Sequence, residues 1–255
     1  MIYLTGFHAI EERIKSGRSC GPLLVAKPGP RARKLTVLAN EKKIRLNKVG
    51  TAELDHISPS HRGIALEVPD GGADSFDISI EEFLESLEES GGGQSRGDKV
   101  RRDALAVVLD EITDPHNYGA ILRSCDQFGV DIVITRNRRI AKYADVVSKT
   151  SAGASAWIPQ AEAANLPRAV EGLKKAGFWV YGADMEGEDA YSLDLRGRVA
   201  IVLGGEGTGI SRLLREGCDA MIAIPSLGRI DSLNVSVAAG VLLYEVTRQR
   251  RMGEL

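Results

Sequence analysis

From residue 104 onward, short apolar runs alternate with segments in which apolar residues recur every three or four positions. Apolar runs with nothing polar to expose are typical of strands buried on both faces of a parallel sheet. These runs occupy 104–109, 131–135, 178–183, 199–203 and 220–224. The helical spacing predicts helices at about 118–128, 141–151, 165–176, 211–217 and 233–251. Strands that alternate with helices predict a parallel sheet with helices on both faces.

Residues 1–70 follow a different, shorter pattern that predicts a small α/β domain. Apolar residues at helical spacing predict a helix within 6–15. A second helix is expected to open with basic Arg31 and Arg33. Short apolar runs predict strands at 23–26, 44–46 and 64–68.

Residues 71–103 separate these two parts. Ile80, Phe83, Leu84 and Leu87 fall on one helical face among glutamates, which predicts a short acidic helix docked on the protein. Residues 91–97 read Gly-Gly-Gly-Gln-Ser-Arg-Gly, a composition typical of a flexible linker. The chain is therefore expected to divide into a domain at 1–70, an acidic helix and linker at 71–103, and a larger domain at 104–255.

Charge is unevenly distributed, although the net charge is only −2. Residues 1–70 carry 12 basic and 7 acidic side chains, whereas residues 71–98 carry 1 and 8. The first segment could meet a polyanion, and the second reads as an acidic spacer. Ordinary surface charge is the alternative interpretation of a difference this small.

Cysteine, histidine and apolar content narrow the class of protein. Cys20, Cys125 and Cys218 are far apart and odd in number, which is typical neither of zinc ligands nor of a disulfide framework. The four histidines form no ligand pair, so no metal is expected. The sequence shows neither a secretory signal nor an apolar run of the ~20 residues that span a membrane. A cytoplasmic protein is expected.

The stretch 201–211 joins an apolar strand to the turn Gly-Gly-Glu-Gly-Thr-Gly. Ligands bind at the carboxyl ends of parallel strands, and glycines let them approach the backbone closely. The turn lacks the Lys-Ser/Thr of a P-loop and the glycine spacing of a dinucleotide fingerprint. It therefore predicts a ligand of another kind, with a tight turn that binds nothing as the alternative.

Two further loops carry polar residues at strand ends. Asn117 is a natural N-cap, and Arg123 follows about two turns into the expected helix, where it could also pair with Asp126. In the loop 224–234, Ser232 or Asn234 could cap the last helix. Taken alone, each of the three loops indicates a functional site only weakly.

The three motifs together have a specific order. Asn-x-Gly-Ala-x-x-Arg is followed by Gly-Gly-Glu-Gly-x-Gly, then by Ile-Pro and Ser-Leu-Asn-Val-Ser-x-Ala. Over about residues 104–250 this resembles the SpoU (TrmH-like) RNA ribose methyltransferases of the SPOUT superfamily. Residues 3–70, with Gly6-Phe-His-Ala-Ile and His61-Arg62-Gly63, are similar to that family's substrate-binding domain. The combination is closest to the subgroup that modifies a guanosine of 23S ribosomal RNA.

The resemblance implies an α/β fold in two parts: a trefoil-knotted parallel-sheet domain, a rare exception to unknotted topology, preceded by a small domain similar to ribosomal protein L30e. S-adenosylmethionine would bind in the knot. The residues that would line it by motif match are Leu203, Gly204, Gly205, Ile224 and Leu233. The resemblance also implies a homodimer through the long C-terminal helix, whose run from Val235 to Leu242 is too apolar for a solvated helix.

From the chemistry of methyl transfer we hypothesise roles for these residues in the reaction. Arg123 would clamp the phosphate beside the target ribose and stabilise charge on the attacking oxygen. Asn117, Ser232 and Asn234 would orient ribose and cofactor, and Glu206 would fix the glycine loop or orient Arg123. A guanidinium stays protonated in proteins, which argues against a base role for Arg123, so proton removal stays unassigned.

RNA contacts are expected on the first domain, from Arg31, Arg33, His61 and Arg62. His61 and Arg62 lie on a turn expected to be exposed, and a polar turn without a ligand is the alternative for them. Transfer RNA is the competing substrate, although a separate N-terminal domain favours ribosomal RNA. A catalytically silent RNA-binding or ribosome-assembly protein of the same fold is the other alternative.

Overall fold

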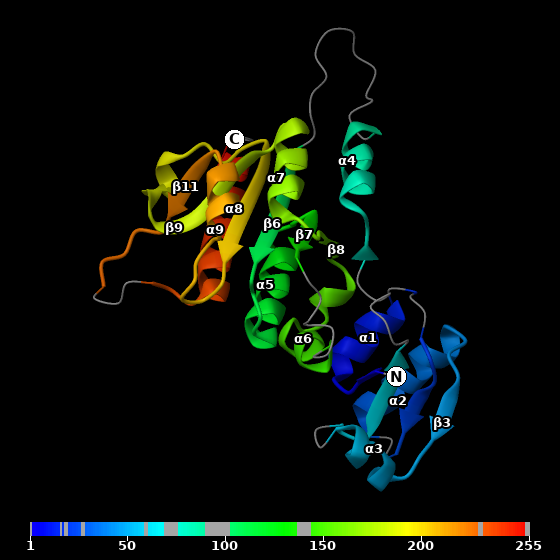
Figure 1. Ribbon diagram of the computed structural model, residues 1–255. Coiled ribbons are helices and arrows are strands. Elements are labelled where there is room, and N and C mark those ends of the chain that lie inside the picture. Colours follow the sequence, from blue (N-terminus) through cyan, green and yellow to red (C-terminus); the bar gives the residue numbers. More distant parts are fainter. Residues whose placement is uncertain are drawn as a thin grey trace.

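The computed structural model describes residues 2–15, 17, 20–26, 29–58, 61–68, 76–89, 103–136, 144–228 and 232–252. A small N-terminal domain lies beside a larger one that contains most of the chain (Figure 1). Among the described residues, no helix is both long enough and apolar enough to cross a membrane.

The small domain is α/β, as the sequence predicts. Its four-stranded sheet has the order β1-β4-β2-β3, with β2 parallel to β3 and antiparallel to β4. Buried apolar side chains of α1 and α2, among them Ile10, Ile14 and Leu35, form its core with the sheet. The elements are β1 (Ile2–Leu4), α1 (Phe7–Lys15), β2 (Leu23–Val25), α2 (Pro30–Glu41), β3 (Leu46–Lys48), α3 (Thr51–Ile57) and β4 (Ile64–Val68).

The large domain is built on a parallel sheet of seven strands in the order β11-β9-β10-β6-β7-β8-β5. The central pair, β6 (Ala104–Asp110) and β10 (Arg198–Gly204), is almost fully buried, because helices cover both faces. The other strands are β5 (Phe76–Asp77), β7 (Ile132–Thr135), β8 (Pro159–Glu162), β9 (Trp179–Asp189) and β11 (Ala220–Ala223). The predicted parallel α/β sheet is confirmed.

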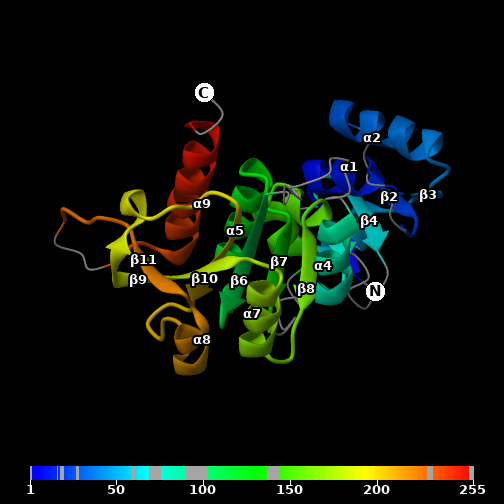
Figure 2. The ribbon, with the colours of Figure 1, turned by 90° about the horizontal axis from the view of Figure 1, so that it is seen from above.

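Two layers of helices enclose this sheet (Figure 2). Side chains of α5 and α9 pack on one face, and side chains of α4, α7 and α8 pack on the other. The helices are α4 (Ile80–Glu89), α5 (Pro115–Gln127), α6 (Ala144–Thr150), α7 (Leu166–Lys175), α8 (Arg212–Gly217) and α9 (Val235–Met252), with short 3-10 helices η2 (Ala154–Ala156) and η3 (Ala190–Ser192).

The acidic helix is docked, as predicted. Ser79 and Glu82 form a capping box at its start: the backbone N–H of Ser79 donates to Glu82 Oε2 at 2.8 Å, and that of Glu82 donates to Ser79 Oγ at 3.0 Å. Phe83 and Leu87 are buried against the sheet. Since β5 pairs with β8, residues 76–89 extend the large sheet and its helical cover. The predicted linker at 91–97 lies outside the described residues.

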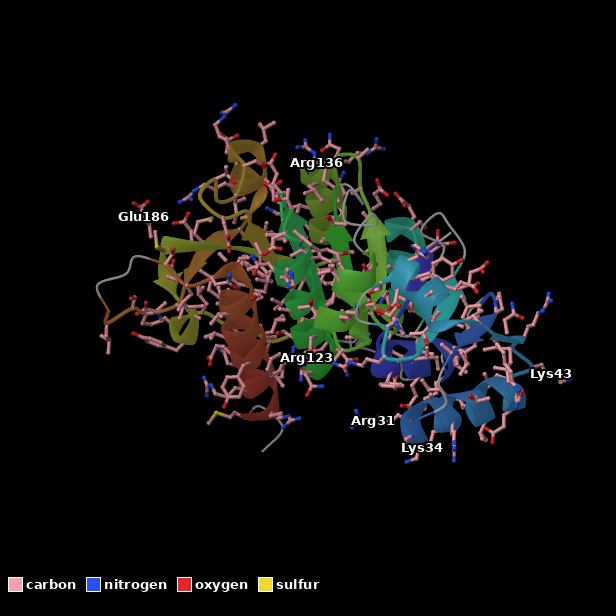
Figure 3. The ribbon with its side chains drawn as sticks, turned by 90° about the horizontal axis from the view of Figure 1, so that it is seen from below. Arg31, Lys34, Lys43, Arg123, Arg136 and Glu186 are labelled. Carbon is pink, nitrogen blue, oxygen red and sulfur yellow. The ribbon has the colours of Figure 1, made fainter. Side chains whose placement is uncertain are left out.

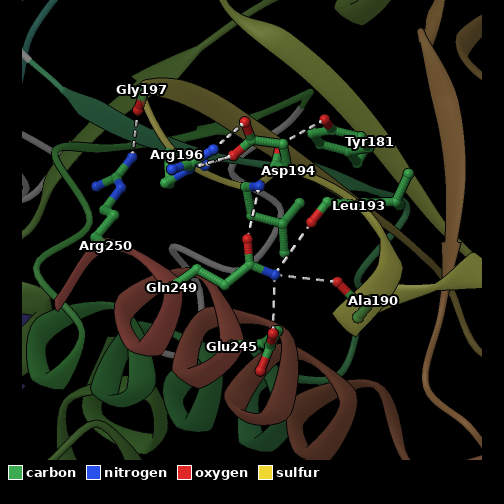
Figure 4. Close-up of polar contacts among 10 residues, drawn as sticks. Tyr181, Ala190, Leu193, Asp194, Arg196, Gly197, Glu245, Gln249 and Arg250 are labelled. Carbon is green, nitrogen blue, oxygen red and sulfur yellow. Dashed lines mark hydrogen bonds and ion pairs between the residues drawn. The ribbon is translucent and has the colours of Figure 1, made fainter. Parts of the chain in front are cut away.

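The C-terminal helix is fastened to the amino-terminal edge of the central strands (Figure 4). Gln249 Nε2 donates to the carbonyl oxygen of Leu193 at 3.1 Å, and its Oε1 accepts from the backbone N–H of Leu195 at 3.0 Å. Arg250 donates to the carbonyl oxygen of Gly197 at 2.7 Å. These bonds fix the C-terminal end of α9 against the start of β10.

Candidate active site

The three sequence motifs meet where β6 and β10 end. Asn117 Nδ2 donates to Glu206 Oε1 at 2.9 Å. Asn234 Nδ2 donates to the same Glu206 oxygen at 2.9 Å and to Asn117 Oδ1 at 3.0 Å. The sheet thus brings together side chains that lie 89 and 117 positions from Asn117 along the chain. We refer to Asn117, Glu206 and Asn234 as the amide–carboxylate cluster.

Asn117 reaches this cluster because α5 begins earlier than its apolar spacing predicts. Asp114 is the N-cap, and its Oδ1 accepts from the backbone N–H of His116 at 2.9 Å. Pro115 occupies the first helical position, where its fixed φ and missing N–H cost nothing. The interpretation of Asn117 as N-cap is therefore wrong. Asn117 lies within the first turn, 8% exposed, and its side chain is available to Glu206.

Asn234 caps the last helix, one of the two caps that the sequence allows. Its Oδ1 accepts from the backbone N–H of Ser236 at 2.9 Å and from Ser236 Oγ at 2.6 Å, so it caps the start of α9. Its Nδ2 is left to donate to the cluster. Ser232 is exposed two residues earlier, and no bond joins it to the cluster.

The glycine loop folds back on the end of β10. A Cβ on Gly204 would lie 2.1 Å from the carbonyl carbon of Gly209, and a Cβ on Gly205 would lie 2.9 Å from the carbonyl oxygen of Glu111. Gly207 and Gly209 have φ of +79° and +63°, which glycine adopts freely. Asp110, at the end of β6, accepts from the backbone N–H of Ser211 at 2.8 Å and closes the loop.

The residues expected to line a cofactor differ in what they could present to it. Leu203 is 1% exposed and packs in the core, so only its backbone can meet a ligand. Gly204 and Gly205 present backbone without side chains. Ile224 is partly buried, and Leu233 is 50% exposed beside Asn234. Apolar side chains and backbone polar groups of this kind suit a flat nucleoside base.

Arg123 stands apart from the cluster. It follows Asn117 by six residues on α5, which corresponds to about 9 Å along the axis and about 240° around it. Its side chain is exposed, and within the described part of the chain it forms neither the ion pair with Asp126 nor another hydrogen bond. Figure 3 places it on the same side of the molecule as Arg31 and Lys34, away from Arg136. The structure therefore gives no contact through which Glu206 would orient Arg123.

The residues predicted to contact RNA divide into two groups. Arg31 and Arg33 are exposed on α2, and Arg62 is exposed on the turn before β4, where its φ is +52°. His61 is only 8% exposed, so the expectation that it lies on an exposed turn is wrong. Its Nδ1 accepts from the backbone N–H of Gly63 at 2.7 Å.

The opposite ring nitrogen of His61 explains why it is buried. Nε2 lies 3.0 Å from Asp55 Oδ1, on α3. Because Nδ1 already accepts a hydrogen bond, Nε2 is the donor in this pair. The ring thus ties the turn to α3, a function that its polar neighbours in the sequence do not reveal.

Two buried side chains beside the cluster form hydrogen bonds that the sequence does not predict. We refer to this pair as the buried brace. The hydroxyl of Tyr118, next to Asn117, donates to Gln160 Oε1 on β8 at 2.7 Å. Gln160 Nε2 donates in turn to the carbonyl oxygen of Ser155, in η2, at 3.3 Å. Nothing in the spacing of residues 42 positions apart predicts this contact.

The thiols of Cys125 and Cys218 are buried or partly buried. Burial raises the pKa of the Cys125 thiol far above its usual range, and burial raises that of Cys218 to about 11. Neither thiol is therefore available as a thiolate nucleophile near neutral pH. Among the described residues, no group of three or more His, Cys, Asp or Glu side chains is arranged to hold a metal ion.

Known proteins resemble this chain over most of its length. Residues 104–244 match the model of the SpoU rRNA Methylase family, and residues 3–70 match that of RNA 2'-O ribose methyltransferase substrate binding. The chain is 42% identical over 224 residues to a 23S rRNA (guanosine-2'-O-)-methyltransferase RlmB of Xanthomonas campestris, covering 87% of this chain and 84% of the relative. It is 37% identical over 226 residues to an uncharacterized tRNA/rRNA methyltransferase of Borreliella burgdorferi, covering 88% and 96%.

Solved structures show the same fold. The SpoU methyltransferase AviRb from Streptomyces viridochromogenes superimposes with a TM-score of 0.76 at 25% identity, over 99% of this chain and 90% of AviRb. The same enzyme in complex with AdoMet gives a TM-score of 0.72 over 98% and 90%, at an identity of 23% that supports the fold alone. The chain therefore belongs to the SpoU rRNA methylase family, enzymes that use S-adenosylmethionine to methylate a ribose 2′-oxygen of RNA.

Proposed function

We propose that this enzyme methylates the ribose 2′-hydroxyl of a guanosine in 23S ribosomal RNA. The observation that carries the proposal is the amide–carboxylate cluster, which joins all three family motifs at the carboxyl edge of the sheet. The substrate comes from relatives named for that reaction, among them the one 42% identical over most of both chains. The N-terminal match to a substrate-binding model supports RNA recognition by the small domain.

The residues around the glycine loop fit S-adenosylmethionine. The close approach of Gly204 to Gly209 leaves backbone groups, without side chains, facing the strand end. Ile224 and Leu233 supply apolar surface for the adenine ring. The bound cofactor would supply an electrophilic methyl group attached to a positively charged sulfur. Transfer of that methyl group leaves a neutral thioether.

The side chains around the site then have to position the ribose and control charge. In the cluster, Glu206 Oε1 accepts two hydrogen bonds and so fixes the direction of both amide side chains. We assign Asn117 and Asn234, with Ser232 beside them, to the orientation of ribose and cofactor. Negative charge grows on the 2′-oxygen as its proton leaves, and we assign Arg123 to stabilise it and to hold the adjacent phosphate. A permanently charged guanidinium with no protein partner in the described chain suits both tasks.

We also propose that the enzyme is a homodimer that pairs through α9. Val237, Val241 and Tyr244 are 50%, 41% and 56% exposed on the outer face of this helix, beside Phe128 of α5. A second copy would cover them. Only part of the apolar run from Val235 to Leu242 is therefore available to a second copy, because Val235 and Leu242 themselves are buried in this chain's own core. In such a dimer, residues of both protomers would build each active site.

The trefoil knot, the likeness of the small domain to ribosomal protein L30e and a cytoplasmic location belong to the same proposal. β11 lies at the sheet edge beyond β9, and α9 returns from it to pack on α5. That return path is what a knotted C-terminal segment requires. All three cysteines are free, in keeping with a reducing compartment.

The test is transfer of a labelled methyl group from S-adenosylmethionine to unmodified 23S ribosomal RNA and, in parallel, to unmodified transfer RNA. We expect label on the 2′-oxygen of one guanosine of the ribosomal RNA and none on transfer RNA. Label on transfer RNA alone would replace the proposed substrate. Label on neither RNA, with the cofactor bound, would favour a silent RNA-binding protein.

A further inference from the structure

Among the described residues, the two domains touch outside the active site, at a contact that we call the joint. α1 and β1 of the small domain lie against α6 and η2 of the large domain (Figure 1). Directly after η2, Trp157 Nε1 donates to Glu12 Oε2 of α1 at 2.5 Å. Trp157 is 38% exposed, so its ring is large, partly covered and fixed at one end by a hydrogen bond to a carboxylate.

The segment that carries Trp157 is itself held to the helix of the active site. The buried brace from Tyr118 through Gln160 reaches the carbonyl oxygen of Ser155, two residues before Trp157. Ser155 also donates from its backbone N–H to Ser151 Oγ at 3.3 Å. The joint therefore rests on hydrogen-bonded contacts that lead to α5, the helix that carries Asn117 and Arg123.

A second attachment makes this joint important for domain orientation. The chain leaves the small domain after β4 and enters the large sheet as β5, which pairs with β8. β8 begins at Pro159, two residues after Trp157. A connection through the chain alone would leave the small domain free to rotate, because domains move relative to one another unless a large apolar interface joins them. Two attachments close to one strand restrict that rotation.

The orientation that results places positive charge of both domains on one side. Figure 3 shows Arg31 and Lys34 of α2 on the same side as Arg123, whereas Arg136 lies on the opposite side. All three side chains are exposed. Phosphates of one RNA molecule could contact both domains at once only while this arrangement persists.

We propose that Trp157 is a positioning residue, which docks the small domain through Glu12 so that one RNA contacts α2 and Arg123 together. This inference rests on the proposed function. Trp157 touches neither the amide–carboxylate cluster nor the glycine loop, so its effect should be confined to the affinity for long RNA. Losing the joint costs RNA affinity, because RNA binding must then also restrict the rotation of the small domain.

The test compares Trp157→Phe with Trp179→Phe in the full-length protein. Trp179 is the second of the two tryptophans, 60% exposed at the start of β9 and away from the small domain, and so is the matched control. For a 23S RNA fragment that spans both domains, Trp157→Phe should raise KM about three- to tenfold, the loss expected for one hydrogen bond. The turnover number at saturating RNA and the affinity for S-adenosylmethionine should not change, and Trp179→Phe should behave as the wild type.

Two further arms separate positioning from a general structural role. Glu12→Ala should raise KM as much as Trp157→Phe, and the double variant should be no worse than either. A short hairpin that carries the target guanosine but cannot reach α2 should show the same KM with wild type and Trp157→Phe. A KM that stays at the wild-type value for the long fragment, or a loss of cofactor affinity, would overturn the proposal.

A readout without RNA separates this inference from the proposed function. In small-angle X-ray scattering, Trp157→Phe should broaden the distribution of distances between the domains, and Trp179→Phe should not. An identical distribution for all three proteins would overturn the inference even if the RNA is methylated as proposed. Failure of the wild type to methylate any RNA would instead contradict the proposed function. Scattering would still decide whether Trp157 docks the small domain.

Discussion

The catalytic edge of the large domain and the basic face of the small domain are built on different principles. Asn117, Glu206 and Asn234 come from three distant segments, and hydrogen bonds join each of them to the other two. Arg31, Arg33 and Lys34 are all exposed, and they lie close together on one helix. We propose that the first region acts through fixed geometry and the second through charge. Substitutions in the two regions should therefore change different kinetic quantities.

The packing beneath each region accounts for this difference. β6 and β10 are buried on both faces, so the loops that follow them start from fixed points. α2 buries only Ala32, Leu35 and Ala39 and leaves its other face to solvent. Basic side chains keep their charged ends in water on such a face, which suits the phosphate contacts of the proposed function.

The largest effect is expected at the arginine that belongs to the catalytic motif but lies outside its hydrogen-bonded cluster. Arg123→Ala should lower the turnover number by about 10²–10³-fold, the usual cost of removing one donor that stabilises developing charge. Cofactor affinity should be preserved, because Arg123 does not touch the glycine loop. Arg136→Ala, at an exposed arginine on the opposite side, is the control. Radiolabel transfer and calorimetric cofactor titration measure the two quantities, and lost cofactor affinity would refute the assignment.

A methyl group at the end of β10 should damage the fold of the catalytic edge itself. In Gly204→Ala, the new Cβ would meet the backbone of Gly209 at 2.1 Å, and backbone cannot move aside cheaply. We expect a loss of about 3 kcal/mol in the free energy of unfolding, together with loss of cofactor binding. Gly207→Ala, with open space around it but a positive φ, should cost about 1 kcal/mol. Denaturant titration would contradict the account if the two variants were equally stable.

Removing the shared acceptor of the cluster should have an intermediate effect. Glu206→Gln keeps the shape of the side chain but loses the charge that accepts from Asn117 and Asn234. The turnover number should fall about 10- to 100-fold, the range for a hydrogen bond to a charged group. Asn117→Ala should add little in the Glu206→Gln background, because both remove one network. Full additivity would show that the side chains act independently, and Glu186→Gln at an exposed glutamate is the control.

The smallest effect is expected on the basic face. Arg31→Ala should weaken RNA binding about two- to fivefold, with no change in turnover at saturating RNA. It should also lower the slope of log affinity against log salt by about 1, the signature of one lost phosphate contact. Arg212→Ala, an exposed arginine on α8 that pairs with Glu216, should change neither quantity. A change in turnover for Arg31→Ala would mean that the basic face takes part in the chemistry.

The sequence predicted those parts of the fold that depend on local patterns. The strands at 104–109 and 199–203 were predicted because they are apolar throughout, and α7 because Asn165 caps it and Gly177 ends it. β8 was missed because it is four residues long and starts with proline. α3 was missed because it buries only Leu54 and so shows no repeating apolar face.

The motifs indicate candidate residues of the site, but only the tertiary structure gives their contacts. Asn117 was read as a cap, although the Asp114-Pro115 pair before it was a usable signal for an earlier helix start. His61 was read as exposed because both neighbours in the chain and the turn itself are polar. The bonds to Glu206 and Asp55 join residues from different elements, which neither periodicity nor composition can predict.

The difference between the two regions can be measured directly in a single turnover. The rate of methyl transfer to a saturating 23S RNA fragment should be followed for Arg123→Ala and for Arg31→Ala, alongside the RNA dissociation constant of each. The account predicts a rate lowered at least 100-fold for Arg123→Ala, and an unchanged rate with weaker RNA binding for Arg31→Ala. A wild-type rate for Arg123→Ala at saturating RNA would contradict it.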